Sequence, residues 1–315
     1  MRRSRLLVLV VAVAVVHSAS RAARGADQPP ADLARVAVTS TPITAFAPRA
    51  GFDRHDPSNV VLWENRFWVY YTHNVDDHRH VTIHHGSSAD GLHWEDHGPA
   101  LEGGVAGTWD ESGVIAPYVV IHDGTFHLYY TGFRGSDLAT RDLGVATATS
   151  PAGPWTRHPG NPVLRRSPQA ADWDSGMLGD SNVLHRDGRW WLYYKSRRDG
   201  ETNLQTRIGV AAAAAPTGPF RRCVENPLFP GHAFTAWPHA GGVAAVCGVV
   251  SPKLFWAADG IRFGEAGTLA TESTGLFTPD GDGDPRHRWG IEVESGVIDG
   301  RRARGLRRFD WRFGP

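Results

Sequence analysis

The chain has 315 residues, with 33 basic and 33 acidic side chains and a pI near 7.3. This balanced charge argues against nucleic acid or an anionic membrane surface as the main partner, because both attract basic proteins. Apolar residues make up 41% and charged residues 21% of the chain, which excludes a wholly disordered protein. The 36 Gly, 21 Pro and 12 Trp favour many short strands joined by turns over a helical bundle.

The N-terminal segment predicts export. Three arginines lie within the first five residues, an apolar run spans 6–16, and small residues follow at 18–20. This order of basic, apolar and small residues is typical of a secretory signal. The apolar run is well short of the roughly 20 residues of a membrane-spanning helix. We therefore expect residues 1–26 to be a signal peptide and lead-in, the protein to be periplasmic or extracellular, and no stable membrane span after cleavage. An uncleaved anchor is the alternative.

Three segments share one pattern. Residues 56–71, 116–130 and 180–194 each contain a polar or small start, an apolar run, a tight turn and a second run that ends in two tyrosines. The Asp-Gly pairs at 123–124 and 187–188 are strong hairpin signals, because a type I′ turn needs positive φ at both central residues. The pattern recurs about every 60 residues, a period typical of propellers and other repeat folds.

A second repeated element follows each hairpin. This element is a turn that contains Gly and ends in an aromatic residue. It follows a short apolar strand each time, and its four copies are residues 89–94, 151–155, 216–220 and 258–263. Each repeat then holds about four strands, which indicates the blades of a β-propeller.

The repeats predict an all-β fold, with residues 38–315 forming one five-bladed β-propeller. The last blade should contain 288–293 and 306–313 and be completed by chain from the N-terminal side. A β-sandwich is the competing fold, but its turns would lack this repeat.

Acidic residues stand at equivalent points of two repeats. Asp56 and Asp180 each lie just before an apolar strand, where the inner strand of a propeller blade enters the central channel. Paired carboxylic groups across a pocket are typical of glycosidic cleavage, in which one group activates water and another protonates the leaving oxygen. The alternative is that both aspartates only stabilise turns.

The chain also resembles a known group of enzymes. The motifs are His-Asp-Pro-Ser (55–58), Trp-Asp-Glu-Ser-Gly-Val-Ile-Ala-Pro (109–117), Tyr-Tyr-Lys (193–195), the block from Glu225 to Ala245, and Arg-Phe-Asp (308–310). They are similar to motifs of five-bladed propeller glycosidases, and most specifically to those of glycoside hydrolase family 117, which is related to families 43 and 32. The resemblance implies an inverting, exo-acting enzyme. Members of family 117 release 3,6-anhydro-L-galactose from α-1,3-linked agar oligosaccharides.

The resemblance assigns roles residue by residue. Asp56 matches the general base, Asp180 the second carboxylate and His232 the general acid. The family commonly has Glu after that histidine, whereas this chain has Ala233, which can neither donate a proton nor accept a sugar hydroxyl. The anhydrogalactose specificity is thus an open point, and Glu111 is the reserve acid.

Four further residues are predicted to bind substrate: His55, Trp109, Lys195 and Trp237. We expect no required cofactor, although the sequence leaves open a divalent metal ion in the channel. The acidic run at 280–284 begins like a calcium loop, but Pro285 replaces the Gly that such a loop needs.

Cys223 and Cys247 are the two cysteines of the chain, and they allow a single disulfide in an exported protein. Two buried thiols are the alternative.

The sequence leaves two classes of function. The first is a secreted glycoside hydrolase that removes a terminal sugar during polysaccharide degradation, either of the family 117 type or an arabinofuranosidase or xylosidase of the family 43 type. The second is a non-catalytic, carbohydrate-binding propeller. Inversion predicts that base and acid stand roughly 6.5–9.5 Å apart. The oligosaccharide is the one partner we expect, and the oligomeric state stays open.

Overall fold

The structure is a computed structural model that describes residues 28–75, 80–135, 141–248, 252–269, 276–277 and 287–314. The predicted signal segment and the acidic run at 280–284 lie outside these residues. Within them the chain forms strands and two 3-10 helices, η1 (Ala31–Ala34) and η2 (Asn203–Gln205), without an α-helix. The predicted all-β class is therefore confirmed. The described part also lacks any helix with the length and apolar character needed to cross a membrane.

The antiparallel strand pairs of the described residues fall into five consecutive groups. The first contains β2 (Asp53–His55), β3 (Val61–Trp63), β4 (Arg66–Val75), β5 (His80–Ser88) and β6 (Trp94–Leu101). The second contains β7 (Gly113–His122), β8 (Thr125–Phe133), β9 (Arg141–Ala148) and β10 (Thr156–Arg157). The third contains β11 (Met177–Arg186), β12 (Arg189–Arg197), β13 (Arg207–Ala213), β14 (Arg221–Arg222) and β15 (Phe229–Pro230).

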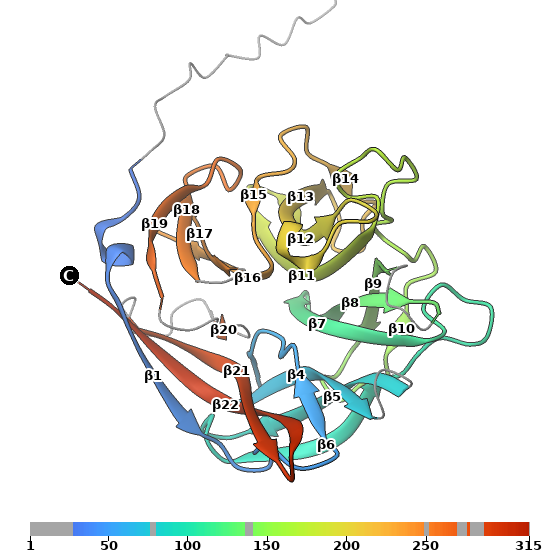
Figure 1. The fold of residues 1–315 in the computed structure, drawn as a ribbon, viewed down its shortest axis with the longest axis vertical. Coiled ribbons are helices and arrows are strands. Elements are labelled where there is room, and N and C mark those ends of the chain that lie inside the picture. The colour runs from blue at the N-terminus through green and yellow to red at the C-terminus, as the bar shows by residue number, and fades with distance from the viewer. Residues whose placement is uncertain are drawn as a thin grey trace, which may run out of the picture.

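The last two groups complete the set. The fourth contains β16 (Ala233–His239), β17 (Gly242–Gly248), β18 (Lys253–Ala257) and β19 (Gly264–Thr268). The fifth contains β20 (Leu276–Phe277), β21 (His287–Ile298), β22 (Arg301–Phe313) and the N-terminal strand β1 (Val36–Pro42). In Figure 1 the groups follow one another around a common centre, and strands such as β7, β11 and β16 lie nearest to it.

The two ends of the chain meet in the fifth group. β1 pairs with β22 over its whole length, from Val36 opposite Phe313 to Pro42 opposite Arg307. In Figure 1 the blue strand β1 accordingly lies beside the red strand β22. The prediction that N-terminal chain completes the last group is therefore confirmed. This pairing joins residues from the two ends of the sequence within one group.

Each group contains one tight hairpin with the same backbone geometry. The Asp-Gly pairs at 123–124 and 187–188 have positive φ at both residues, as a type I′ turn requires. The same two positive φ values occur at 64–65, 240–241 and 299–300. The first of these turns is Glu-Asn and contains no glycine, so its geometry follows from the repeat and could not be read from local sequence.

The paired tyrosines explain how neighbouring groups pack. In each of the first three groups the first tyrosine donates its hydroxyl hydrogen to a backbone carbonyl of the next group. The contacts are Tyr70 to Pro151 (2.6 Å), Tyr129 to Pro216 (2.5 Å) and Tyr193 to Gly260 (2.8 Å). Each acceptor lies in the repeated turn between the third and fourth strands of its group. All three rings are buried, so each contributes both apolar packing and a satisfied hydroxyl.

Candidate active site

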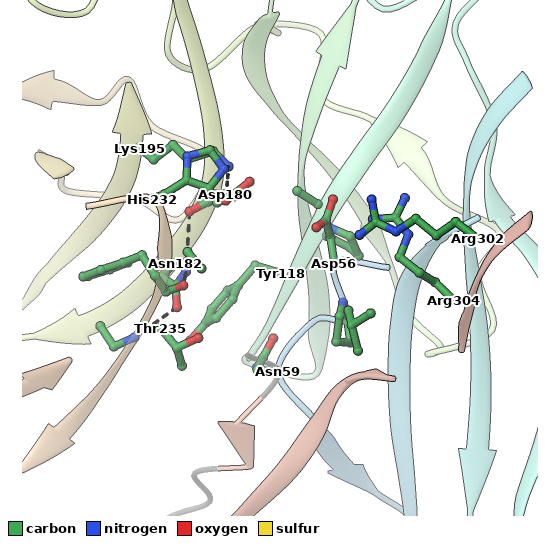
Figure 2. A pocket seen from close by; sticks show the side chains of 18 residues that line it. Asp56, Asn59, Tyr118, Asp180, Asn182, Lys195, His232, Thr235, Arg302 and Arg304 are labelled. Atoms are coloured by element: carbon green, nitrogen blue, oxygen red, sulfur yellow. Dashed lines mark hydrogen bonds and ion pairs between the residues drawn. The ribbon is translucent and has the colours of Figure 1, made fainter. Parts of the chain in front are cut away.

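A cavity of about 370 Å³ lies where the inner strands of the groups begin. Asp56, Asp180 and His232 all line it, so the three residues that the resemblance assigns to catalysis are brought together. Lys195 also lines it, as predicted for a substrate-binding residue. Figure 2 shows Asp180, Lys195 and His232 on one side of the cavity and Asp56, Arg302 and Arg304 on the other.

The backbone at the strand starts aims these side chains. Asp56, Ala116 and Asp180 occupy equivalent positions in the first three groups, and their φ values are 45°, 52° and 50°. A left-handed conformation costs a residue other than glycine roughly 1–2 kcal/mol. In the second and third groups the strand register shifts at this point, between Ile115 and Tyr118 and between Gly179 and Asn182. Such bulges redirect side chains and are common beside active sites.

Asparagines fix the strand starts to the next group. The Asn59 side chain exchanges two hydrogen bonds with the backbone of Val119, at 2.8 and 2.9 Å. Asn182 donates to the carbonyl of Phe234 and accepts from the amide of Ala236. The second clamp holds the start of β16 beside His232. It therefore sets the position of this histidine relative to Asp180.

Lys195 connects the two predicted functional residues of its wall. Its Nζ lies 2.5 Å from Oδ2 of Asp180 and 3.2 Å from Nε2 of His232. The lysine is buried and comes from β12, beside the bulge that carries Asp180. A buried ammonium needs such partners, because an unpaired charge inside a protein is costly. Asp180, Lys195 and His232 thus form one hydrogen-bonded unit, which we call the acid-wall cluster.

The hydrogen bonds assign the protonation state of His232. Nδ1 lies 3.0 Å from Oγ1 of Thr206, whose own hydroxyl hydrogen goes to the carbonyl of Asn203. Nδ1 must then carry a hydrogen and donate it, while Nε2 accepts one from Lys195. Both ring nitrogens are engaged, and the ring is neutral.

The electrostatics of His232 agree with a neutral ring. Burial lowers the pKa of His232 below its usual value, and the adjacent Lys195 charge lowers it further, against the opposing effect of Asp180. Burial acts to raise the pKa of Asp180, but the charge and hydrogen bond of Lys195 oppose it, and the net shift is downward. Lys195 contacts both Asp180 and His232, and its charge opposes the effect of Asp180 on the histidine.

Asp56, on the opposite wall of the cavity, makes only long contacts with its neighbours. Its Oδ2 lies 3.7 Å from Nε2 of His55 and accepts a long hydrogen bond of 3.5 Å from Thr72. His55 is buried behind it, with Nδ1 3.4 Å from Oδ1 of Asp53, and Arg304 binds both oxygens of Asp53. Burial acts to raise the pKa of Asp53, but hydrogen bonds from His55 and Arg304 hold it well below its usual range. Asp56 itself keeps room for a water or sugar contact.

Four predicted residues lie away from the cavity wall. Glu111, the reserve acid, binds Nε of Arg134 at 2.7 Å and the backbone amide of Gly107. His55 supports Asp56 from behind and does not line the cavity.

The two predicted tryptophans have packing roles. Trp109 stacks on Tyr130 with ring centroids 5.7 Å apart, and Trp237 is fully buried against Trp311. Neither lines the cavity, so the structure does not offer these rings for sugar stacking.

Cys223 and Cys247 are not joined to each other, so the disulfide that the sequence allowed is not formed. Cys247 is buried in β17, and its sulfur lies so close to Gly231 that a Cβ built there would come within 2.0 Å. Cys223 is half-buried, and burial raises the pKa of its thiol. Each sulfur therefore acts as a small packing group.

No set of three or more His, Cys, Asp or Glu side chains within the described ranges is arranged to hold a metal ion. The side chains of the cavity that could bind a metal agree with this. Asp180 already pairs with Lys195, and His232 accepts a hydrogen bond from the same lysine. These residues do not fit a channel-bound divalent ion, and the requirement for any cofactor stays a prediction.

Sequence reasoning missed three groups of residues that shape the site. Arg302 and Arg304 line the cavity, Thr206 orients His232, and the two asparagine clamps fix the strand starts. The asparagines had a signal, because Ser-Asn follows both Asp56 and Asp180 closely. Thr206 had none, since it precedes His232 by 26 residues and meets it through tertiary structure alone.

Known glycoside hydrolases resemble this chain. The family model described as glycosyl hydrolases family 43 matches residues 48–181, a span that includes Asp56 and Asp180. A search of curated proteins found no match.

Solved structures give the more extensive likeness. Zg3597, a family 117 glycoside hydrolase from the marine bacterium Zobellia galactanivorans, is 25% identical, with a TM-score of 0.78 over 90% of this chain and 92% of that chain. The GH43_1 enzyme from Xanthomonas citri complexed with xylose is 17% identical, with a TM-score of 0.57 over 85% and 89%. A family 32 β-fructofuranosidase from Bombyx mori is 15% identical, with a TM-score of 0.60 over 83% of this chain and 61% of that chain.

These findings bear out the resemblance to family 117 and its relation to families 43 and 32. The chain is a glycoside hydrolase of the type that these families represent, and its substrate is a carbohydrate.

Proposed function

We propose that the protein is an exported, exo-acting, inverting glycoside hydrolase that removes one terminal sugar from polysaccharide-derived oligosaccharides. The observation that carries this proposal is that Asp56 faces the acid-wall cluster across a cavity of about 370 Å³. Export rests on the N-terminal sequence pattern.

We further propose that each antiparallel group is one blade of a five-bladed propeller. The support is that every group among the described residues has its own hairpin with two positive φ values. The pairing of β1 with β22 supplies the fifth group with an N-terminal strand, as a propeller needs to join its first and last blades.

In the proposed mechanism Asp56 is the general base. It takes a proton from a water molecule, whose oxygen attacks the anomeric carbon from the face opposite the leaving group. As the glycosidic carbon–oxygen bond breaks, its electron pair stays on the leaving oxygen, which accepts a proton from the acid wall. Asp56 is left protonated and the acid deprotonated, and solvent exchange restores both.

His232 is the proposed proton donor of the acid wall. In the resting site its Nε2 accepts a hydrogen from Lys195, so the ring must first gain a proton before it can serve as an acid. Its lowered pKa means that this protonated fraction falls as pH rises through a value below the usual one of histidine. We therefore expect activity to be highest at acidic pH and to decline towards neutrality.

The choice of sugar rests on the residues opposite Asp56. A family 43 type of enzyme would require a glutamate as the acid there, and none of the described residues that line the cavity is a glutamate. This favours the family 117 type over an arabinofuranosidase or xylosidase. Ala233 lines the cavity where that family commonly has Glu, so 3,6-anhydro-L-galactose is one candidate sugar among others.

The test is a panel of marine and plant oligosaccharides, assayed for released monosaccharide, with NMR of the first product to read its anomeric configuration. We expect one linkage to be cleaved with inversion. Asp56→Asn should lower kcat by at least about 100-fold while oligosaccharide binding persists, because a general base typically contributes 10²–10⁴-fold. Retention of configuration would contradict the mechanism. Binding without cleavage of any linkage would instead support the carbohydrate-binding alternative.

A further inference from the structure

The hairpin of β21 and β22 presents a charged face to the cavity. Directly paired residues of two strands share a face, so Arg302 and its partner Val297 lie together, as do Arg304 and Ser295. Val293, Arg302 and Arg304 all line the cavity, which identifies this face as the inward one. Its acidic neighbours Glu292 and Glu294 fall on the opposite face of the same hairpin because side chains alternate along a strand.

Two of the three lysine and arginine side chains that line the cavity already have acidic partners. Lys195 binds Asp180 at 2.5 Å, and Arg304 binds both oxygens of Asp53. Arg302 forms no hydrogen bond or ion pair with any residue in the described part of the chain. The residue across from it, Val297, is apolar and cannot compensate its charge.

A further positive charge lies behind the same cavity. Arg141 at the start of β9 acts electrostatically on both Asp56 and Asp180, and its buried Nε has no hydrogen-bond partner. Asp180 is therefore paired with Lys195 and lies near Arg141, without a contribution from Arg302. A neutral sugar that filled the cavity would remove water from the Arg302 guanidinium without supplying an opposite charge, which is unfavourable.

We propose that Arg302 binds an anionic substituent of the terminal sugar, a carboxylate or a sulfate ester. This inference rests on the proposed function, because it names the substrate class of that same site. A guanidinium matches the planar, two-oxygen geometry of either group. Arg304 also lines the cavity, but its charge is paired with Asp53. Arg302 supplies the unpaired positive charge. Arg302 is thus a specificity-determining residue, and Asp56 is left free to act on water.

The test compares monosaccharide ligands in matched pairs by NMR titration of the wild-type protein. The anionic probes are D-glucuronate, D-galacturonate, D-mannuronate and D-galactose 6-sulfate, and the neutral counterparts are glucose, galactose and mannose. We expect at least one anionic sugar to bind about tenfold or more tightly than its neutral counterpart, as one hydrogen-bonded charge contact provides. The uronates and the sulfated sugar distinguish the two sources of negative charge.

Variants assign the preference to one side chain. Arg302→Gln should remove the difference between anionic and neutral sugars, and Arg302→Lys should retain part of it. Arg301→Gln is the matched control, because Arg301 is exposed like Arg302 but lies on the opposite face of the same strand, and it should behave like wild type. Circular dichroism checks that each variant is folded.

Three outcomes would overturn the proposal. They are equal affinity for charged and neutral sugars, an unchanged preference in Arg302→Gln, and equal competition by inorganic sulfate or acetate, which would show an anion site without sugar recognition. The proposed function can fail separately. Cleavage of neutral oligosaccharides that depends on Asp56, without any preference for anionic sugars, would overturn this proposal alone. Tight binding of the anionic monosaccharides, together with no cleavage of any charged or neutral oligosaccharide, would overturn the hydrolytic function alone.

Discussion

The second and third groups of strands share one scaffold but differ at the cavity. In the second, Trp109 stacks on Tyr130, whose hydroxyl donates to the buried Asp110. The third repeats this with Trp173, Tyr194 and Asp174. An arginine binds each buried aspartate, Arg157 at 2.8 Å and Arg222 at 2.5 Å. An asparagine after β10 or β14 reaches the same tyrosine hydroxyl in both groups, Asn161 in the second and Asn226 in the third.

The cavity ends of the two groups have diverged. Ala116 stands where the third group has Asp180, and Thr131 stands where it has Lys195, at matching points of the strand register. The left-handed backbone is nevertheless retained at both Ala116 and Asp180. The comparison shows that the bulge belongs to the repeated scaffold, whereas the charged pair is an addition that only the third group carries. Four predictions test this separation of scaffold and chemistry.

The largest effect is expected from Asp180→Ala, which gives the third group the residue of the second. We expect kcat to fall by about 10²–10⁴-fold, because Lys195 and His232 lose the carboxylate that positions them. The fold should persist, since Ala116 adopts the same backbone conformation. Steady-state kinetics and circular dichroism check this. Retained activity would show that the acid wall works without its carboxylate.

The scaffold networks should give the next largest effect, on stability. Asp110→Ala and Asp174→Ala each leave an arginine and a tyrosine without their buried partner, which typically costs about 3–5 kcal/mol. We expect similar losses in the two groups, measured by urea unfolding. A loss in one group alone would contradict the equivalence of the two networks.

The pH dependence of activity should respond to Lys195→Met. Lys195 lowers the pKa of His232, so its removal should raise that pKa. A general acid works below its pKa, and activity is lost as pH rises through that value. The alkaline limb of the kcat/KM profile should therefore move to higher pH. Thr131→Val in the second group is the control and should leave the profile unchanged. An unshifted limb in Lys195→Met would remove His232 from the acid role.

The smallest effect is expected from the hydroxyls that link neighbouring groups. Tyr129→Phe and Tyr193→Phe each delete one buried hydrogen bond to the turn of the next group, at 2.5 and 2.8 Å. A loss of about 1 kcal/mol is typical for one such bond. Thermal unfolding should show similar small shifts for both, with kcat unaltered. A large loss of activity in either would place the inter-group contact within the catalytic function.

The sequence predicted the repeated architecture because the repeat is local. The Asp-Gly turns at 123–124 and 187–188 and the paired tyrosines each depend on residues close in the chain, and both appear as expected. Asp56 and Asp180 were found for the same reason, since they occupy equivalent positions of the repeat, and both line the cavity. His232 required the family resemblance, because no repeat marks it.

Residues whose role depends on contacts with distant parts of the chain could not be identified from the local repeat. Trp109 was expected in the cavity, but a tryptophan beside an aspartate begins both the second and third groups, and its ring packs over Gly132 and Gly144. Trp237 belongs to a buried cluster that includes Trp311, more than 70 positions later in the chain. In both cases the aromatic side chain serves packing, which sequence alone does not distinguish from sugar stacking.

The sequence by itself determined the all-β class, the period of the repeat, and two carboxylates at matching strand starts. These depend on side-chain alternation and turn geometry, which act over a few residues. The tertiary structure alone decided the state of the acid wall, where Lys195 from β12, Thr206 after η2 and His232 before β16 meet. It also brought Arg302 from the last strand into the cavity of Asp56. Charge and hydrogen bonding depend on distance in space, and the ring of groups sets those distances.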